Sequence, residues 1–585
     1  MGSTRFNVRL SAFSLFLTFA MIVLSSVLIF CAGQQLIDSP ITIDFEASAV
    51  LTVSQPINQT DPSWTKVGKN LSYTAGATKI NKTSMSDLTA ILDNKDAFGN
   101  ISSALYGADT YMNAPVYKDI DIANIDLATG EILGYLSDPS YPFEWFGRSV
   151  TLPAGRTLAS GRTLTSQTTF AEVDCYTKFP TMYIRRYIEN NVQYLSVSDK
   201  TFDGAVKIDE FYVGTFEARM IDANNKTTIY PRSFIPTNGA GPLTSGSLSY
   251  AVTNYGTIDS ANIKGTSTTQ AQMQAWMDNL TNKWKNSGFN STTYKSAKGC
   301  QGENWKRDVI NILYLIKYAN NNSQEQVGYG ASYNYDKSTG SNKYYDSEKG
   351  GGTVTTYSSA LTYGYDQTYQ NSHINSNNID IVNSTDPKGL YAPQFLVKNI
   401  NDGTKTTKRV LLDGFVGTDK YAGVFCLGMA NLWGNVQEWT FGETAVYDST
   451  AKTKNAYVNF NDYDGSNWVL SNSPSSVTSS SQYVKLSYNL PTSGGYYTNL
   501  SASTGGSTYE SIVGFVSSGT TTASSSTGLC DYYYGSGTST GYVYGVLRGG
   551  FVSNRNAAGL FLIDVYGSLT DADVVIGFRP SLILG

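Results

Sequence analysis

Histidine is almost absent from this 585-residue chain, in which His373 is the only one. Ser-His-Asp and Cys-His nucleophilic sites need a histidine as base, and His373 lies in a polar, Gly-rich stretch where we expect a solvated side chain. The sequence also contains no GxSxG elbow and no Walker-type phosphate loop. We therefore expect a protein that is not an enzyme of these classes.

Charge is scarce too. Only 15% of the residues are charged, the net charge is -5, and no stripe of Lys and Arg occurs. Phosphate backbones are bound by clustered basic residues, so we expect no nucleic-acid partner. The hydrophobic content of 41% and the 42 tyrosines are ample for packed cores, and the length predicts two or three domains.

The cysteines are few and far apart. Without Cys31, which belongs to an N-terminal apolar run, the disulfide candidates are Cys175, Cys300, Cys426 and Cys530. An even number in an oxidising compartment predicts two disulfides with three connectivities, and free buried thiols are the alternative. No CxxC pair exists, so no cysteine-based zinc site is expected.

The N-terminus has the pattern that export machinery reads. Arg5 and Arg9 precede an uncharged run over residues 10–31, and the first acidic residue is Asp38. The run is long for a cleaved signal and just long enough to cross a bilayer. Both a signal peptide and an N-terminal anchor that contacts the membrane remain open. Everything from about Gln34 is expected to be extracellular or on the cell surface, either secreted or membrane-anchored.

The texture of the sequence changes along the chain. We expect a signal or anchor over 1–33, a β-rich spacer module with a linker over 34–164, and a larger domain over 165–585. In the larger domain, strands are predicted at 182–188, 193–197 and 205–213. Apolar residues at helical spacing predict helices over 269–284 and 305–319. The polar, Gly-rich stretches 337–377 and 471–527 are predicted to be long surface loops.

Two segments carry more specific patterns. NLWGNVQEWT begins at Asn431, and VLRGGF, which begins at Val546, is followed by IGFRP from Ile576. In them, glycines permit close backbone approach, tryptophans anchor a core, and arginines hold loops by charge-assisted hydrogen bonds. The expected structural residues are Trp433, Gly434, Asn435, Glu438, Trp439, Arg548, Gly549, Gly550, Gly577, Phe578 and Arg579.

These motifs resemble the GNVWEW and RGGSW…GFR signatures of the formylglycine-generating-enzyme-type, or sulfatase-modifying-factor, domain. The resemblance covers about 165–585 and implies an α+β, C-type-lectin-like fold with long irregular loops. It also implies which residues would bind a catalytic metal. The copper-binding cysteines of those enzymes follow the RGGS motif, but residues 551–560 hold no cysteine. The iron-binding histidine cluster of the ergothioneine-pathway relatives has no counterpart here. We expect a non-catalytic head without a cofactor.

One loop offers oxygen ligands at the spacing of a calcium site. Asp462, Asp464 and Asn467 could contribute carboxylate and amide oxygens to such an ion. The loop lacks the distal Glu of an EF-hand, so an ordinary Asx-rich turn is the alternative interpretation.

The C-terminal part, 511–585, contains no Lys, Glu, Gln, Met, Trp or His. Codons that are randomised at two positions and end in a pyrimidine cannot encode most of these residues. The resemblance extends to variable proteins of diversity-generating retroelements, which place such codons at the end of C-type-lectin-like genes. Tyr, Ser, Asn and Gly are also the residues that binding surfaces favour. The expected ligand-binding residues are Tyr532, Tyr533, Tyr534, Tyr542, Tyr544, Asn554, Asn556, Phe561, Asp564 and Tyr566.

The sequence therefore predicts an exported adhesion or ligand-binding protein with an extracellular protein or glycan as partner, and oligomers are compatible with it. Two alternatives remain open. The chain could be a structural subunit of an extracellular filament, coat or virus-like particle. It could also be a divergent oxidase of the formylglycine-generating type.

Overall fold

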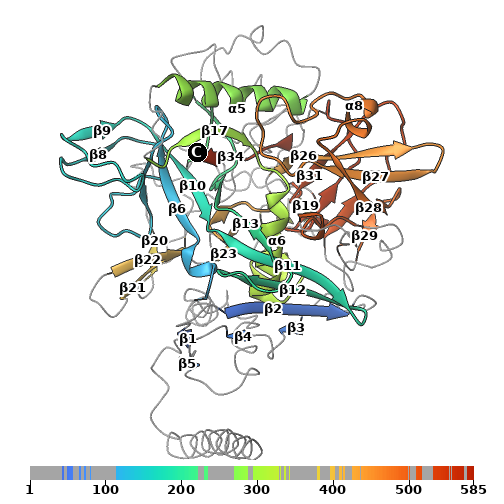
Figure 1. Ribbon diagram of the computed structural model, residues 1–585, viewed down its shortest axis with the longest axis horizontal. Coiled ribbons are helices and arrows are strands. Elements are labelled where there is room, and N and C mark those ends of the chain that lie inside the picture. The colour runs from blue at the N-terminus through green and yellow to red at the C-terminus, as the bar shows by residue number, and fades with distance from the viewer. Residues whose placement is uncertain are drawn as a thin grey trace, which may run out of the picture.

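In the described part of the chain, the computed structural model is an α+β protein rich in sheets and poor in helices, which confirms the expected fold class at this level (Figure 1). The structure describes residues 43–44, 49–56, 65–66, 72–73, 79–80, 114–145, 147–221, 230–234, 269–287, 294–328, 330, 335–336, 341–342, 379–381, 396–401, 407–411, 413–415, 424–434, 436–497, 500, 509–516, 531–551, 554, 557–571 and 576–584. The predicted N-terminal signal or anchor, His373 and Cys530 lie outside these residues.

The first sheet has six strands and joins distant parts of the chain. In hydrogen-bonded order it contains β17 (Ala297–Gly302), β34 (Pro580–Leu584), β14 (Phe211–Gly214), β10 (Val173–Phe179), β6 (Asp121–Asp126) and β7 (Ile132–Tyr135). Successive residues of a strand point to opposite faces. In β10, Cys175 and its neighbour Tyr176 accordingly enter two different hydrophobic clusters, so this strand is buried on both faces.

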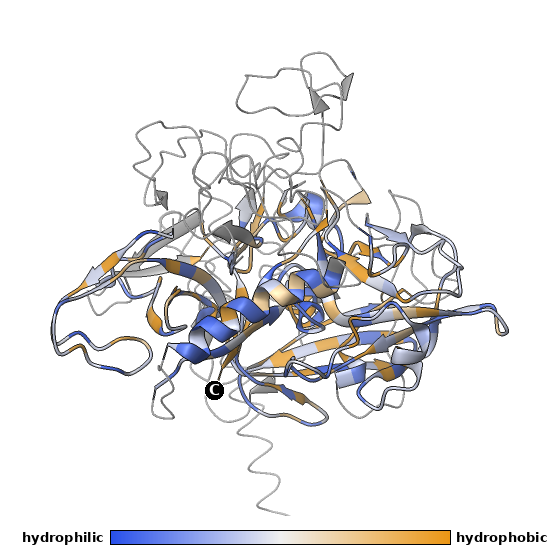
Figure 2. Ribbon diagram, turned by 90° about the horizontal axis from the view of Figure 1, so that it is seen from above, coloured by the Kyte–Doolittle hydropathy of each residue, from blue (hydrophilic) through white to orange (hydrophobic). Residues whose placement is uncertain are grey.

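Helix α5 (Thr269–Asn286) lies along this sheet, where it packs on β17 (Figure 1). Its buried apolar side chains recur at helical spacing and form one face: Met273, Trp276, Met277, Leu280 and Trp284. Figure 2 shows hydrophilic and hydrophobic residues mixed along the helix, as expected for a helix with one solvated side. The helix predicted over 269–284 is confirmed.

The second sheet contains β13 (Val206–Ile208), β11 (Met182–Glu189), β12 (Val192–Ser198), β2 (Ala49–Pro56) and β3 (Thr65–Lys66), with β4 (Ser72–Tyr73) paired to β2. The strands predicted at 182–188 and 193–197 are confirmed as the antiparallel pair β11–β12. The strand predicted over 205–213 is instead two, β13 and β14, which belong to different sheets.

Helix α6 (Lys306–Tyr318) confirms the second predicted helix and is buried from Arg307 to Lys317. A helix that is apolar on most sides must be covered on most sides. Its side chains share one hydrophobic cluster with strands of the second sheet and of the third, so α6 lies between them. The helix ends at Tyr318, and its C-cap Ala319 has a left-handed backbone (φ 51°) that turns the chain out of the helix. The N–H of Ala319 donates to the oxygen of Leu315.

The third sheet has eight strands and carries most of the C-terminal part. In order it contains β28 (Val484–Leu490), β27 (Thr453–Val458), β26 (Gln437–Asp448), β31 (Tyr544–Arg548), β32 (Ile563–Asp564), β30 (Tyr532–Tyr534) and β29 (Gly495–Tyr496), with β33 (Ile576–Gly577) parallel to β26. Part of the stretch 471–527, predicted to be one long loop, therefore forms strands β28 and β29.

The remaining described elements are short. They are β1 (Ile43–Asp44), β5 (Lys79–Ile80), β8 (Val150–Leu152), β9 (Thr168–Phe170), β15 (Arg219–Ile221), β16 (Tyr230–Arg232), β18 (Tyr335–Asp336), β19 (Ser341–Asn342), β20 (Ile379–Ile381), β21 (Leu396–Asn401), β22 (Thr407–Leu411), β23 (Gly414–Phe415), β24 (Val424–Cys426), β25 (Met429–Ala430), η2 (Tyr117–Asp119), α7 (Ser323–Gln326), α8 (Pro474–Thr478) and η4 (Tyr509–Ser511).

The predicted boundary between a spacer at 34–164 and a head at 165–585 is wrong. Strand β6 pairs with β10 over six residues, and β2 pairs with β12, so strands from both sides of the boundary share sheets. The sequence shows that a segment forms a strand, but not which strand will satisfy its hydrogen bonds. Apart from β1 and β5, which pair with each other, the described strands of 34–164 share sheets with strands of the head.

Candidate functional site

The two sequence motifs meet in the core around Arg579. Its guanidinium donates hydrogen bonds at 2.9 to 3.2 Å to the backbone oxygens of Gly214, Thr215, Ala430 and Asn431. It also pairs with Glu438 at 2.7 Å, and both side chains are almost fully buried. Glu438 in turn pairs with Arg307, which binds Glu303 at 3.2 Å. The motif arginine therefore joins the loop before β26 to the first and third sheets.

Arg548 forms a second buried group of charges. Its Nη2 lies 3.3 Å from Asp308 and 3.2 Å from Glu443, and all three side chains are buried. Burial raises the pKa of Glu443 to about 8, against the lowering effect of Arg548. Glu303, Arg307, Asp308 and Glu443 were not predicted from the sequence. For Glu303 and Arg307, the available signal was their spacing of four residues at the start of an apolar helix.

The other motif residues take structural positions. Trp433 and Trp439 are buried, and the indole of Trp433 donates to the oxygen of Gly328 at 3.1 Å. Gly434 has φ of 80°, and its N–H donates to the oxygen of Gly549. Gly549 and Gly550 likewise have positive φ, while Gly577 and Phe578 are buried where the chain enters β34. Asn435 lies outside the described residues.

The ten predicted ligand-binding residues divide into buried and accessible sets. Tyr533, Tyr544 and Phe561 are fully buried, so for these three the prediction is wrong. Tyr533 donates from its hydroxyl to the oxygen of Pro491, and Phe561 packs on Tyr314 of α6. The cause is the alternation of a strand: Tyr533 points inward and its neighbours Tyr532 and Tyr534 point outward.

The accessible residues gather at one end of the third sheet. We define the tyrosine surface as Tyr496, Tyr532, Tyr534, Asn554 and Asp564, all half-buried. The rings of Tyr496 and Tyr532 lie 5.1 Å apart, and those of Tyr532 and Tyr534 lie 4.5 Å apart. The amide of Asn554 donates to the hydroxyl of Tyr534 at 3.3 Å, and Asp564 pairs in register with Tyr534.

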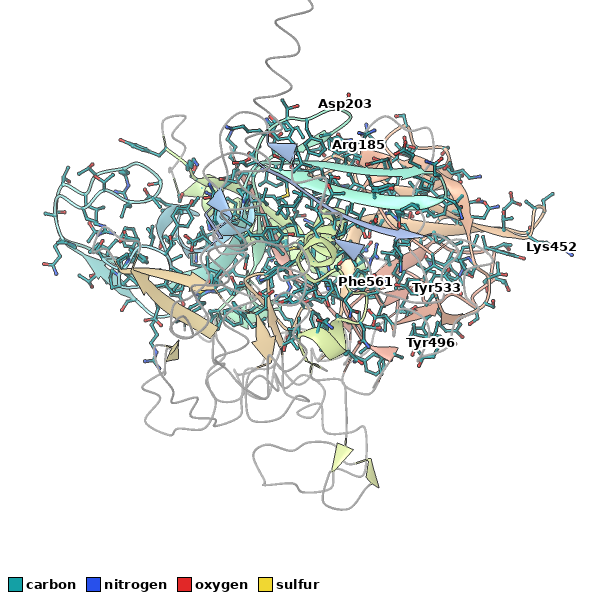
Figure 3. The ribbon with its side chains drawn as sticks, turned by 90° about the horizontal axis from the view of Figure 1, so that it is seen from below. Arg185, Asp203, Lys452, Tyr496, Tyr533 and Phe561 are labelled. Carbon is teal, nitrogen blue, oxygen red and sulfur yellow. The ribbon has the colours of Figure 1, made fainter. Side chains whose placement is uncertain are left out.

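Figure 3 shows Tyr496 and Tyr533 on the same side of the molecule, away from Arg185 and Asp203. Tyr496 joins the surface because β29 pairs with β30 and places it opposite Tyr532. Tyr496 was not predicted as a binding residue, since the sequence predicts a loop for its segment. The adjacent aromatic pair Tyr496–Tyr497, next to glycines, was the available signal.

The remaining candidates lie around this surface or outside the described residues. Tyr566 is 57% exposed and follows Asp564, whose Oδ1 accepts its backbone N–H at 2.8 Å. Tyr542 is half-buried and packs on Tyr544, with 4.9 Å between ring centroids. Asn556 lies outside the described residues.

The chemistry of the tyrosine surface is aromatic and weakly acidic. Burial raises the pKa of Tyr534 to about 12, so its hydroxyl is neutral and both donates and accepts hydrogen bonds. Burial also raises the pKa of Asp564 to about 6, which leaves the carboxylate mostly ionised at pH 7. Contiguous tyrosines with a carboxylate and an amide offer stacking and hydrogen bonds together, as binding surfaces do.

The predicted calcium loop is an Asx turn. Asp464 Oδ1 accepts the backbone N–H groups of Ser466 and Asn467, each at 2.9 Å. Asp462 binds Lys306 at 2.8 Å and the amide of Gln301 at 3.1 Å. The Oδ1 atoms of Asp462, Asp464 and Asn467 thus each accept a hydrogen bond from a protein donor. In the described residues, no group of three or more His, Cys, Asp or Glu side chains could hold a metal ion.

The predicted disulfides are not formed by the cysteines that the structure describes. Cys175, Cys300 and Cys426 are buried free thiols in three different hydrophobic clusters. Burial raises the pKa of each thiol above its ordinary value. An even count of cysteines carries no information on their positions in space, so counting could not distinguish disulfides from buried thiols.

A small cavity lies between β11, β12 and α6. Its lining includes Arg186, Asp308, Asn311 and Phe561. The space open to water is about 20 Å³, room for roughly one water molecule. A sugar ring or a peptide side chain does not fit there, so the tyrosine surface is the better candidate site.

The described features define a class: a sheet-rich α+β protein with a buried arginine–carboxylate core and a half-buried tyrosine surface. Neither the protein-family models nor the curated proteins include a match to this chain. Among the described helices, none is both long enough and apolar enough to span a membrane.

Proposed function

We propose that this protein is an exported, surface-displayed ligand-binding protein whose non-catalytic head binds through the tyrosine surface. The head is of the C-type-lectin-like, formylglycine-generating-enzyme type, and its ligand is an extracellular protein or a glycan. The N-terminal segment directs export and contacts the membrane, as a signal or as an anchor.

The observation that carries the proposal is the packing of Tyr496, Tyr532 and Tyr534 into one accessible strip. Fully buried tyrosines would belong to the core, and isolated exposed tyrosines would not indicate a binding site. Rings held 4.5 and 5.1 Å apart by paired strands lose little conformational entropy when a ligand covers them. A pre-ordered aromatic strip of this kind is typical of recognition surfaces.

The lectin-like part of the proposal has its own support. Arg548 and Arg579, the arginines of the two C-terminal motifs, are both buried and ion-paired. They join segments far apart in sequence, as expected for residues that close a fold with long insertions. Such a fold hosts many functions, so binding is argued from the surface and not from the fold.

A binding array tests the proposal. The purified chain is applied to immobilised oligosaccharides and cell-surface proteins, beside the double variant Tyr532→Ser/Tyr534→Ser. We expect the wild-type chain to be retained on a defined set of spots. The double variant should bind those spots about 10- to 100-fold more weakly, because truncated aromatic anchors are costly.

A matched control is available on the second sheet. Tyr187 and Tyr194 are half-buried, and their rings stack 4.9 Å apart on β11 and β12. The variant Tyr187→Ser/Tyr194→Ser should bind as the wild type does. Equal losses in both double variants, or no retention of the wild type on any spot, would contradict the proposal.

A further inference from the structure

A fully buried lysine lies behind the tyrosine surface. Lys454 is the second residue of β27, and its side chain is 0% exposed. Its Nζ donates to the backbone oxygens of Gly535 at 3.0 Å and Val565 at 2.9 Å. It also lies 3.9 Å from the centroid of the Tyr544 ring.

The two acceptors are placed at the ends of the strands that form the surface. Gly535 directly follows Tyr534 at the end of β30, and Val565 directly follows Asp564 at the end of β32. One amine thus joins both strand ends to β27, which pairs through its hairpin partner β26 with β31 of the same sheet. The contact fixes the backbone immediately beside Tyr534 and Asp564.

We propose that Lys454 is the positioning residue of the tyrosine surface: from the buried side it ties β30 and β32 together and so holds Tyr534 and Asp564 in place. The role of the surface as a binding site rests on the proposed function, whereas the tie itself is a property of the free chain.

The two backbone hydrogen bonds of Lys454 need no charge on the amine. A neutral amine has two N–H groups, and two backbone oxygens accept them; an ammonium adds a third N–H and a charge. The groups that face Lys454 are Asp564 on β32, Tyr544 on β31 and, in register across the hairpin, Tyr447 on β26. Its partner on β28 is the apolar Leu490. Burial lowers the pKa of Lys454 to about 7, and Asp564 opposes this only in part.

The direction of the pH effect follows from proton linkage. When β30 and β32 separate from β27, the amine becomes solvated and regains an ordinary pKa near 10.4. Opening therefore takes up a proton between about pH 7 and pH 10, so the tie strengthens as the pH rises through this range. The carboxyl of Asp564, with its pKa raised to about 6, has its effect at lower pH, between its ordinary value and 6.

Hydrogen exchange of the free chain tests the tie without any ligand. Protection factors, corrected for intrinsic exchange, are measured at pH 7 and pH 9 for peptides covering 531–536 and 562–567. In the wild type we expect protection of both to rise by up to about tenfold per pH unit. In Lys454→Met, whose side chain at this position does not titrate, this rise should be absent. Peptides covering β6 and β10 are the internal control.

A wild type without the rise, or a Lys454→Met variant that keeps it, would overturn the proposal. If the variant does not fold, an NMR pH titration of the wild-type chain, labelled with ¹³C at the lysine ε-carbon, tests the proposal instead. A lysine signal that titrates near pH 7 is expected, and titration of all lysines near pH 10 would overturn it. Because no ligand is used, a failed binding array leaves this result unaffected, and a failed exchange experiment leaves the array unaffected.

Discussion

Replacing Arg579 by Met is expected to lower the free energy of unfolding by about 3–5 kcal/mol, the usual cost of removing one partner of a buried ion pair. The loss leaves the carboxylate of Glu438 buried with Arg307 as its remaining cationic partner, at 3.3 Å. It also leaves four backbone oxygens without the guanidinium donor. Chemical denaturation of the purified variant and wild type measures the difference.

An exposed ion pair provides the control for this substitution. Lys207 and Asp209 lie 2.5 Å apart with both side chains largely in solvent. Lys207→Met should leave the unfolding midpoint unchanged within error, because water screens such a pair. If Arg579→Met lowers the free energy of unfolding by less than about 1 kcal/mol, the buried ion pair and hydrogen bonds of Arg579 do not stabilise the core as proposed.

The second large effect is a fall in stability with rising pH that depends on Glu443. Burial raises the pKa of this carboxyl to about 8 in the folded protein, from an ordinary value of 4.5. A raised folded-state pKa means that the stabilisation is complete below about pH 4.5 and is lost as the pH rises through 8. The slope reaches about 1.4 kcal/mol per pH unit where only the unfolded chain has lost the proton.

Urea unfolding at pH 5, 6, 7 and 8 checks this for the wild type and Glu443→Gln. Glutamine has nearly the shape of the protonated acid but does not titrate. The stability of the variant relative to the wild type should therefore increase steadily across these pH values. A constant difference between the two proteins would show that Glu443 keeps an ordinary pKa.

The sequence predicted those parts of the fold that local periodicity determines. Helices α5 and α6 were predicted because apolar residues recur every three or four positions along them. The motif tryptophans and arginines were predicted because few positions other than a core use such residues beside glycines. The partners of β2 and β6 could not be predicted, since strands β12 and β10 lie far from them in sequence and such pairing leaves no local pattern.

The candidate site was predicted in composition but not in geometry. Three tyrosines in a row in β30 must alternate, but the sequence does not say whether the middle one or the outer two face solvent. Tyr544 and Phe561 look like binding residues by type and are core by position. Lys454 was missed because a lysine between polar residues of a hairpin is normally solvated.

The accessible residues of the tyrosine surface also indicate which positions would vary in a diversified C-terminus. Pyrimidine-ending codons that vary Tyr532, Tyr534 or Asn554 would change the surface and spare the core. Variation at Tyr533 or Phe561 would instead disturb packing around α6. A retroelement-targeted protein is therefore expected to vary at the first set and to keep the second.

Hydroxyl-radical footprinting shows directly whether the ligand sits on the tyrosine surface. The chain is oxidised alone and in complex with a component of the array that binds it. Oxidation at each tyrosine is then measured by mass spectrometry. We expect protection at Tyr496, Tyr532 and Tyr534 and none at Tyr187 and Tyr194. Protection confined to Tyr187 and Tyr194, or unchanged oxidation of Tyr532 and Tyr534 in a saturated complex, would contradict it.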